Sequence, residues 1–136
     1  MFEMSKKELF SSYVDNLLSK KEVESQLVRA VKGGYYEEVK FLYKKNPQEL
    51  LDYPDILIDA VTSSYILKTS YKYQNIIKVI QFLTTLNEVE IDYQDKFGHT
   101  ALIVASCVYN VEDAISILLE AGARTDIENN NGFKFN

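Results

Sequence analysis

The sequence predicts an all-α fold made of short helices that pack in antiparallel pairs. Apolar residues recur with helical spacing along several stretches of the chain, and glycine or proline ends these stretches after a few turns. Short helices joined by tight turns favour antiparallel neighbours. The chain has 136 residues, 46% of them hydrophobic and 26% charged, which suits one globular domain over residues 1–136.

Three helices are expected in the first part of the chain, over about residues 6–19, 22–32 and 36–45. Ser5 and Glu8 have the spacing of a capping box, which marks the start of the first of them. Gly33 and Gly34 end the second, and Pro47 prevents the third from continuing.

Four more helices are expected later, beginning near Asp55 and Asn75 and covering about residues 100–109 and 111–121. Residues 63–74 form a long joint rich in tyrosine and lysine between the first two of these. Alternation of Val89, Ile91 and Tyr93 predicts an extended arm that leads into a turn at 95–98.

A turn of the form Asp/Asn-x-x-Gly occurs twice, ending at Gly98 and again 34 residues later at Gly132. From residue 95 onward the chain resembles the ankyrin repeat, whose pattern runs roughly D-x-x-G-x-T-P-L-H-x-A-A, two variable residues, G and E-I-V-x-x-L-L-x-x-G-A-D-V-N. The residues that carry this resemblance are Asp95, Gly98, Thr100, Ala101, Leu102, Ala105, Asp113, Ala114, Ile115, Leu118, Leu119, Gly122, Ala123 and the stretch 126–129.

A looser match lies upstream, carried by Leu27, Ala30, Gly34, Glu37, Val39 and Leu42, with "ILIDAV" and "IIKVIQFL" resembling the two helices of a middle unit. Three features depart from the family pattern. Ala101 replaces the proline that opens the inner helix, Ile103 replaces a histidine that ties neighbouring units together, and one extra residue lies near 107–110. These departures weaken the expected network between units.

The resemblance implies an ankyrin-repeat solenoid of stacked helix-turn-helix units with hairpin-like fingers. It divides the chain into an N-terminal capping helix at 1–21, a first unit at 22–54, a second at 55–94 with an insertion at about 63–74, a third at 95–128 and the start of a truncated next unit at 129–136. Small residues are expected where inner helices approach, at Ala30, Ala60 and Ala105, and leucines in the seams, at Leu42, Leu83 and Leu118.

The resemblance also implies a non-catalytic module that binds a partner protein through a concave face formed by the fingers and inner helices. The positions that map onto this face are Lys96, Phe97, His99, Val108, Tyr109 and, in the first unit, Lys32. A second candidate surface is the insertion, with Tyr65, Tyr71, Tyr73, Lys68 and Lys72. Two structural alternatives stay open. Phe97 folds back on its own finger and Tyr109 packs on the next unit, or a longer fourth helix buries the tyrosines.

Catalytic chemistry finds little support in the sequence. His99 and Cys107 are the one pair that suggests a nucleophile and a base, yet their spacing separates them by about two turns within one helix. The alternative is a histidine on the finger surface and a small half-buried thiol. A single cysteine with a single histidine also excludes an intrachain disulfide and the usual zinc ligand sets, so no cofactor is expected.

Charge and hydropathy exclude further classes of function. Residues 47–136 hold six Lys/Arg against thirteen Asp/Glu, which disfavours a nucleic-acid partner. The charged N-terminus "MFEMSKKELF" lacks the apolar run of a secretory signal, and no stretch is apolar enough to span a membrane. We therefore expect a soluble cytoplasmic protein.

The sequence ends shortly after Gly132, before another inner helix forms. This leaves a rival reading in which the chain is the targeting part of a larger protein, such as an enzyme or a viral or pathogen protein that acts on host targets. The flank of the last unit, around Ala114, Ile117 and Leu118, is then expected to be partly bare and available for self-association. An autonomous enzyme would require a pocket that unites His99 with Cys107.

Overall fold

The computed structural model describes residues 5–18 and 24–135 and is helical throughout, with no β-strand in that part of the chain. The predicted all-α class is confirmed. The elements are α1 Lys6–Leu18, α2 Gln26–Gly33, α3 Tyr36–Lys45, the 3-10 helix η1 Pro47–Asp52, α4 Ile56–Ile66, α5 Tyr73–Leu83, α6 Ala101–Ile103, the π-helical turn η2 Val104–Val108 and α7 Glu112–Glu120.

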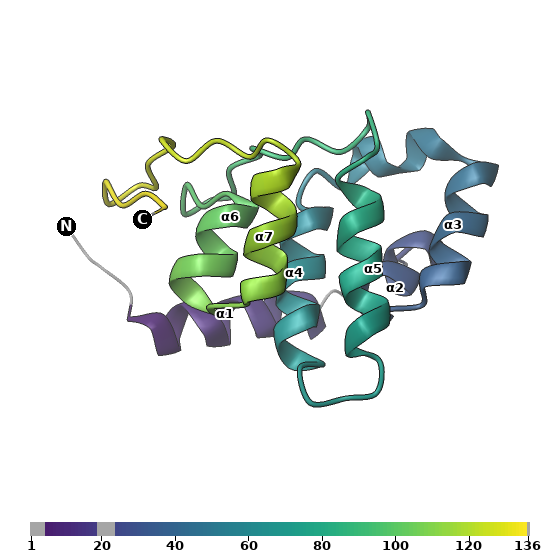
Figure 1. The fold of residues 1–136 in the computed structure, drawn as a ribbon, viewed down its shortest axis with the longest axis horizontal. Coiled ribbons are helices and arrows are strands. Elements are labelled where there is room, and N and C mark those ends of the chain that lie inside the picture. Colours follow the sequence, from purple (N-terminus) through teal and green to yellow (C-terminus); the bar gives the residue numbers. More distant parts are fainter. Residues whose placement is uncertain (1–4, 19–23, 136) are drawn as a thin grey trace.

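The helices form two layers. α2, α4 and the continuous segment α6–η2 make the inner layer, while α3, α5 and α7 make the outer layer. Each inner helix packs on the outer helix that follows it in sequence, and neighbours within a layer also touch, so three antiparallel pairs stack side by side (Figure 1). The core therefore runs as a continuous seam between the layers.

The ends of α2 show how local sequence sets helix length. Ser25 is extended, and its hydroxyl oxygen accepts the backbone N–H of Val28, so the helix begins after Ser25. The predicted start at residue 22 is thus wrong for residues 24 and 25, and residues 22–23 lie outside the described part. Gly34 ends the helix with φ 73° and donates its N–H to the carbonyls of Ala30 and Val31.

The joint between α4 and α5 is shorter than the sequence suggests. α4 continues to Ile66, with Ser63 and Ser64 buried, and α5 already begins at Tyr73. The predicted insertion at 63–74 therefore reduces to residues 67–72, because α4 continues for about one turn beyond Thr62, through its two serines.

The arm before the third pair is not a strand. The Val89 N–H bonds to the Leu86 carbonyl and the Tyr93 N–H to the Glu90 carbonyl, so these backbone groups are used in local turns. The predicted extended arm over 89–93 is therefore wrong. The turn that follows is present, since the Gly98 N–H donates to the Asp95 carbonyl over 2.9 Å.

The inner helix of the third pair begins regularly and then widens. The Thr100 hydroxyl oxygen caps α6 by accepting the Ile103 N–H, and from Val104 onward the turn is π-helical. The Tyr109 N–H reaches back five residues to the Val104 carbonyl. A π-helical turn absorbs one extra residue in a helix, which is the departure from the repeat pattern expected near 107–110.

The seam positions divide into small and large residues as expected. Ala30, Ala60 and Ala105 are buried in the inner layer, and Leu83 and Leu118 are fully buried between pairs, whereas Leu42 remains half-buried. Ala114 is also fully buried, so the expected bare flank of the last unit is wrong for Ala114 and Leu118 because α5, α6 and η2 pack against α7. Ile117, the third residue named for that flank, is half-buried, and self-association through the flank stays a prediction.

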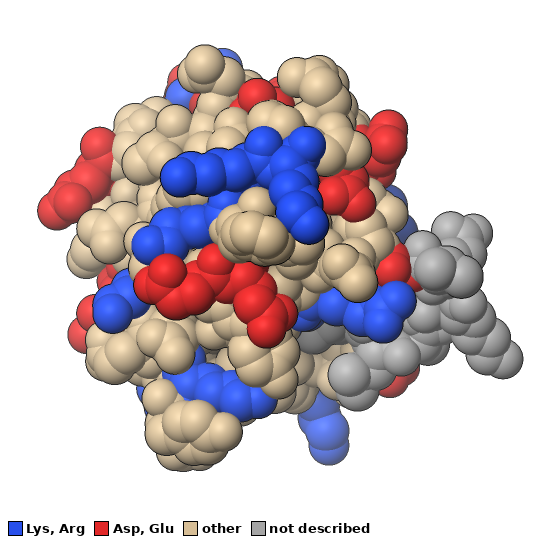
Figure 2. Space-filling view, turned by 90° about the vertical axis from the view of Figure 1, so that its right-hand side faces the viewer, with Lys and Arg blue, Asp and Glu red and all other residues tan. Residues whose placement is uncertain are grey.

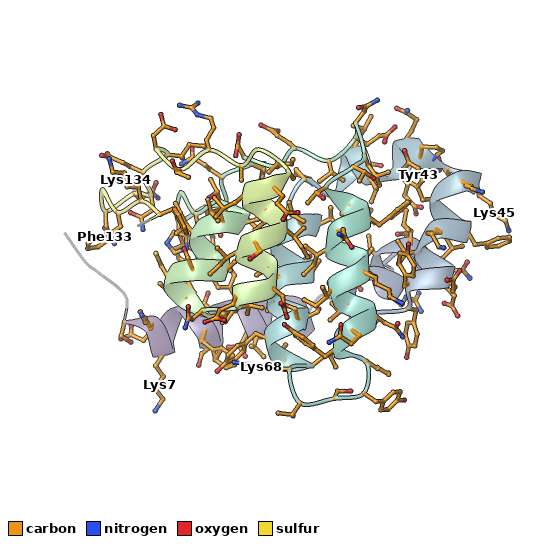
Figure 3. The ribbon with its side chains drawn as sticks, in the orientation of Figure 1. Lys7, Tyr43, Lys45, Lys68, Phe133 and Lys134 are labelled. Atoms are coloured by element: carbon orange, nitrogen blue, oxygen red, sulfur yellow. The ribbon has the colours of Figure 1, made fainter. Side chains whose placement is uncertain are left out.

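The outer end of the first pair carries charges of both signs. Figure 2 views the molecule from the α3 side and shows Lys and Arg side chains interleaved with Asp and Glu rather than one continuous field. Lys45 projects from this end, whereas Phe133 and Lys134 lie at the opposite end of the molecule (Figure 3). None of the helices within residues 5–18 and 24–135 has the length and apolar character needed to cross a bilayer.

Adjacent leucines on α7 test the seam. Leu118→Ala removes a side chain with no exposed surface and is expected to lower the free energy of unfolding by about 2–5 kcal/mol. Leu119 is 39% exposed, so Leu119→Ala is expected to cost less than about 1 kcal/mol. Urea denaturation followed by circular dichroism measures both. Equal losses in the two variants would contradict the packing of α7.

Candidate functional site

The candidate site is the inner face of the stack, which α1 covers. α1 runs across the other helices rather than alongside them (Figure 1), and its main contacts are with α4 and η2. The prediction of an N-terminal capping helix at 1–21 stays a prediction, and the described residues of α1 lie against the second and third pairs. Its aromatic residues find their partners on the second and third pairs, as the ring contacts below show.

α1 forms a helix for local reasons. The Ser5 hydroxyl oxygen accepts the Glu8 N–H over 3.1 Å, which is the N-cap half of the predicted capping box. The Ser5 hydroxyl donates to the Glu8 carboxylate, also over 3.1 Å. One face carries Phe10 and Tyr13 toward the inner layer. The opposite face is solvated, and Lys7 points away from the helices (Figure 3).

Aromatic rings fill the contact between α1 and the inner layer. Phe10 meets Tyr65 edge-on at a centroid distance of 5.2 Å and Tyr109 at 5.6 Å. Those two tyrosines stack on each other at 4.8 Å with an angle of 18° between their planes. Tyr13 meets Phe97 edge-on at 5.8 Å. Such pairs stabilise a contact beyond the area that they bury.

A buried hydrogen-bond chain fixes the register of α1. The Tyr13 hydroxyl donates to Asp95 Oδ2 over 2.5 Å and lies 2.9 Å from His99 Nδ1. Because its own proton goes to Asp95, the hydroxyl oxygen accepts the Nδ1–H of His99. The other oxygen of Asp95 accepts the backbone N–H groups of Phe97 and His99, both over 2.9 Å.

The shifted pKa values of Tyr13 and His99 leave both side chains uncharged at neutral pH, as the hydrogen-bond chain requires. Burial, followed by the hydrogen bond to Asp95, raises the pKa of Tyr13 well above its ordinary value, so the hydroxyl stays protonated. Burial lowers the pKa of His99, against a smaller opposing effect of the Asp95 charge. The imidazole is therefore neutral, with its proton directed at Tyr13. Burial also raises the pKa of Tyr109 to about 12.

The finger and inner-helix residues named from the sequence are mostly covered. Lys96 is exposed and Val108 is half-buried, but His99 retains 4% and Tyr109 5% of its surface. Their predicted exposure on an open concave face is wrong because α1 occupies that face. Phe97 is half-buried against Tyr13, which is a third outcome beside exposure and folding back on its own finger.

Lys32, the predicted face residue of the first unit, is half-buried and forms an ion pair with Glu24. It lies on α2, to which the ring contacts of α1 described above do not extend. The residues that the sequence places on one concave surface are thus brought together at the second and third pairs, while Lys32 belongs to a separate local pairing.

The tyrosine-rich insertion does not form one surface. Tyr65 lies under α1, whereas the Tyr73 hydroxyl donates to Asp113 over 2.7 Å and has its pKa raised to about 12, chiefly by burial. Tyr71 is 89% exposed and Lys68 is exposed as well. The Lys72 ammonium lies over the ring of Tyr35 at 4.7 Å.

A cavity of about 230 Å³ opens at the edge of α1, between this helix, the start of α4 and the turn at 95–98. Three aromatic rings and three carboxylates line it beside one lysine and two smaller side chains. The lining residues are Ser12, Tyr13, Asp55, Ile58, Asp59, Tyr93, Asp95, Lys96 and Phe97. Such a cavity has room for one side chain of a bound partner and is smaller than the clefts of about 300–1,000 Å³ that hold drug-sized ligands.

The hydrogen bonds of His99 and Cys107, the pair that suggests catalysis, go to other residues. His99 Nδ1 is hydrogen-bonded to the Tyr13 hydroxyl, and Cys107 is half-buried with its sulfur 3.6 Å from the Ser106 hydroxyl. His99 is buried, which corrects the alternative of a finger-surface histidine. Among the described residues, no group of three or more His, Cys, Asp and Glu side chains is placed to hold a metal ion.

Sequence reasoning missed Phe10 and Tyr13 as parts of the site, and Asp95 as its polar centre. The available signal was the aromatic pair three residues apart on α1, which marks a face with large rings to bury. That signal does not say where on the molecule the rings go.

The Tyr13 hydroxyl offers a clean test of the buried chain. Tyr13→Phe leaves Asp95 Oδ2 and His99 Nδ1 without this partner and is expected to lower the free energy of unfolding by about 1–3 kcal/mol. Tyr43→Phe is the matched control, since its hydroxyl also bonds a carboxylate, Glu88 at 2.6 Å, but at the surface. There the expected loss is below about 0.5 kcal/mol. Chemical denaturation compares them, and equal losses would contradict the buried network.

The stability of the fold is expected to fall as the pH drops below the ordinary pKa of histidine, 6.5. Because the pKa of His99 is lower in the folded chain than in the unfolded one, the unfolded chain takes up the proton first. The folded state, in which Asp95 and Tyr13 face the ring, therefore loses up to about 1.4 kcal/mol per pH unit between the two pKa values.

His99→Asn is the matched variant for this measurement, because its side-chain amide keeps a donor near Tyr13 and does not titrate. Unfolding at pH 7.5, 6.5, 5.5 and 5.0 compares the two chains, which differ in the only histidine of the sequence. A native chain whose pH dependence matches that of the variant would contradict the neutral, buried state of His99.

Comparison of the chain with protein-family models, with curated proteins and with solved structures found no match.

Proposed function

We propose that the chain is a short ankyrin-like array and that it acts as a non-catalytic module that binds a partner protein through its inner face. The array would consist of the three stacked helix pairs, with the turns at 95–98 and 129–132 as fingers. The resemblance to the ankyrin repeat and the stacking of the three helix pairs both support this proposal.

Repetition of one hydrogen-bond pattern supports the array. The Asp95 N–H bonds to the His99 carbonyl, and Gly98 closes the turn onto Asp95. Thirty-four residues later, the Asn129 N–H bonds to the Phe133 carbonyl, and Gly132 closes the same turn onto Asn129. The side-chain oxygen of Asn129 also accepts two amides, as Asp95 does, those of residues 131 and 133.

Contact between the two turns adds to this support. The Asn130 N–H donates to the Phe97 carbonyl over 3.0 Å, and the Asn130 side-chain amide donates to the Lys96 carbonyl over 2.9 Å. A Cβ atom at Gly98 would come within 2.7 Å of the Asn130 backbone nitrogen, so only glycine allows the turns to approach this closely. Successive fingers stacked in this way are what a repeat array requires.

The single observation that carries the binding function is that the inner face already holds a helix. Aromatic rings from α4, from Tyr109 after η2 and from the turn at 95–98 surround Phe10 and Tyr13, and Asp95 with His99 engages the Tyr13 hydroxyl. An amphipathic helix laid into a groove is one of the recurring modes of peptide recognition. A surface with this chemistry is suited to a helical segment of another protein.

A position-specific cross-linking experiment tests the proposal. A photoreactive benzophenone side chain is placed in the full chain either at exposed Lys96, beside the cavity, or at Phe41, which is 60% exposed on α3. After irradiation in cell lysate, we expect a discrete protein adduct from position 96 and none from position 41. Adducts from position 41 alone would move the interface to α3, and no adduct from either position would contradict the binding function.

A further inference from the structure

We infer that the partner of the inner face presents a helix with a phenylalanine and a tyrosine three residues apart, and that α1 competes with it for the same seat. This inference rests on the proposed binding function and deepens it. The seat is defined by Tyr65, Asp95, Phe97, His99 and Tyr109.

The residues of the seat come from parts of the chain far from α1. Its hydrogen-bonding groups lie 82 and 86 residues from Tyr13 in sequence, and its rings belong to α4, the turn at 95–98 and the residue that follows η2. Each of these contacts depends on the side chain that the helix presents. A helix supplied by another molecule could therefore make the same contacts.

Within residues 6–15, two side chains make the ring contacts of α1, and Leu9 packs against the core beside them. Between residues 6 and 15, Tyr13 alone is buried, and Phe10 makes two of the ring contacts while remaining half-buried. The stacked pairs, in contrast, each bury several aliphatic side chains along their seam. A helix that depends on two rings can be exchanged without disturbing the core behind it.

The chemistry of the seat selects tyrosine at the second position. A phenylalanine there would fill the space beside Phe97 but leave Nδ1 of the buried His99 and Oδ2 of the half-buried Asp95 without this partner. Sites built to bond a hydroxyl reject the analogue that lacks it more strongly than apolar pockets reject a change of size. At the first position, by contrast, the edge contacts with Tyr65 and Tyr109 require a ring and no polar atom.

Competition by α1 sets the affinity that a partner experiences. The apparent dissociation constant equals the intrinsic one divided by the fraction of chains whose seat is open. If α1 fills the seat in about 99% of chains, a partner binds about a hundredfold more weakly than to an open seat. Loss of the α1 contacts should therefore increase affinity for a matching helix, the opposite of what loss of a binding surface would do.

The test measures binding of a labelled peptide with the sequence of residues 5–18, SKKELFSSYVDNLL, to full-length chains by fluorescence anisotropy. The unseated variant carries Phe10→Ser and Tyr13→Ser and keeps every residue of the seat. Lys6→Ser with Lys7→Ser is the matched control, since it changes two exposed residues of the same helix. Circular dichroism first establishes that all chains keep their helical content apart from α1.

We expect the unseated variant to bind the peptide at least about tenfold more tightly than the native and control chains. A peptide with both rings replaced by serine should bind none of them. A peptide with phenylalanine in place of the tyrosine should bind the unseated variant at least about fivefold more weakly. Equal affinity of native and unseated chains, or of ring-bearing and ring-free peptides, would overturn the inference.

If the unseated variant does not fold, Tyr13→Phe in the full chain takes its place. It keeps the ring, weakens the hold on α1 and should bind the tyrosine-bearing peptide several-fold more tightly than the native chain. Affinity equal to that of the native chain would overturn the inference here as well.

The remaining outcomes separate this inference from the proposed function. Cross-linking from position 96 with equal yield in native and unseated chains would overturn the competition and leave the binding function standing. Peptide binding without any adduct in lysate would overturn the proposal that the chain binds a partner protein. A native chain that forms a dimer by exchanging α1 between copies, detected by sedimentation, would identify a second copy as the occupant and also overturn the partner assignment.

Discussion

The structure depends most on the carboxylate of Asp95. One of its oxygens accepts the amides of Phe97 and His99 and so shapes the finger, while the other accepts the Tyr13 hydroxyl from α1. One side chain thereby links a turn near residue 97 to a helix that begins some ninety residues earlier. Because both oxygens of this half-buried carboxylate are engaged, the conformation of the turn at 95–98 and the position of α1 stabilise each other.

Much of the fold could be predicted from local sequence, because its determinants are local. Helical spacing with glycine and proline stops located the helices, and the 34-residue repeat of the Asp/Asn-x-x-Gly turn located both fingers. The small residues Ala30, Ala60 and Ala105 were recognisable because adjacent inner helices have little space between them. In each case, the residues that determine the feature are close neighbours or follow one period.

The position of α1 and the burial of His99 could not be predicted, because both depend on contacts between distant residues. Periodicity shows that Phe10 and Tyr13 share a face but carries no information on which surface receives it. His99 follows a turn glycine and looks exposed in sequence, yet the hydroxyl that satisfies it lies 86 positions away. The start of α2 was missed for a simpler reason. Helical spacing places it at residue 22, whereas the N-cap at Ser25 sets it at Gln26.

Two features of the inner helices converge under α1, and this convergence bears on the proposed function. α4 extends far enough to carry Tyr65 to its end, and the π-helical turn shifts Tyr109, which follows it, relative to a regular helix. The two rings stack on each other and together receive Phe10. A π-helical turn sacrifices regular hydrogen bonding, so it persists where another interaction compensates. Here that interaction is the aromatic contact with α1, which makes the seat a built feature of the inner face rather than a by-product of stacking.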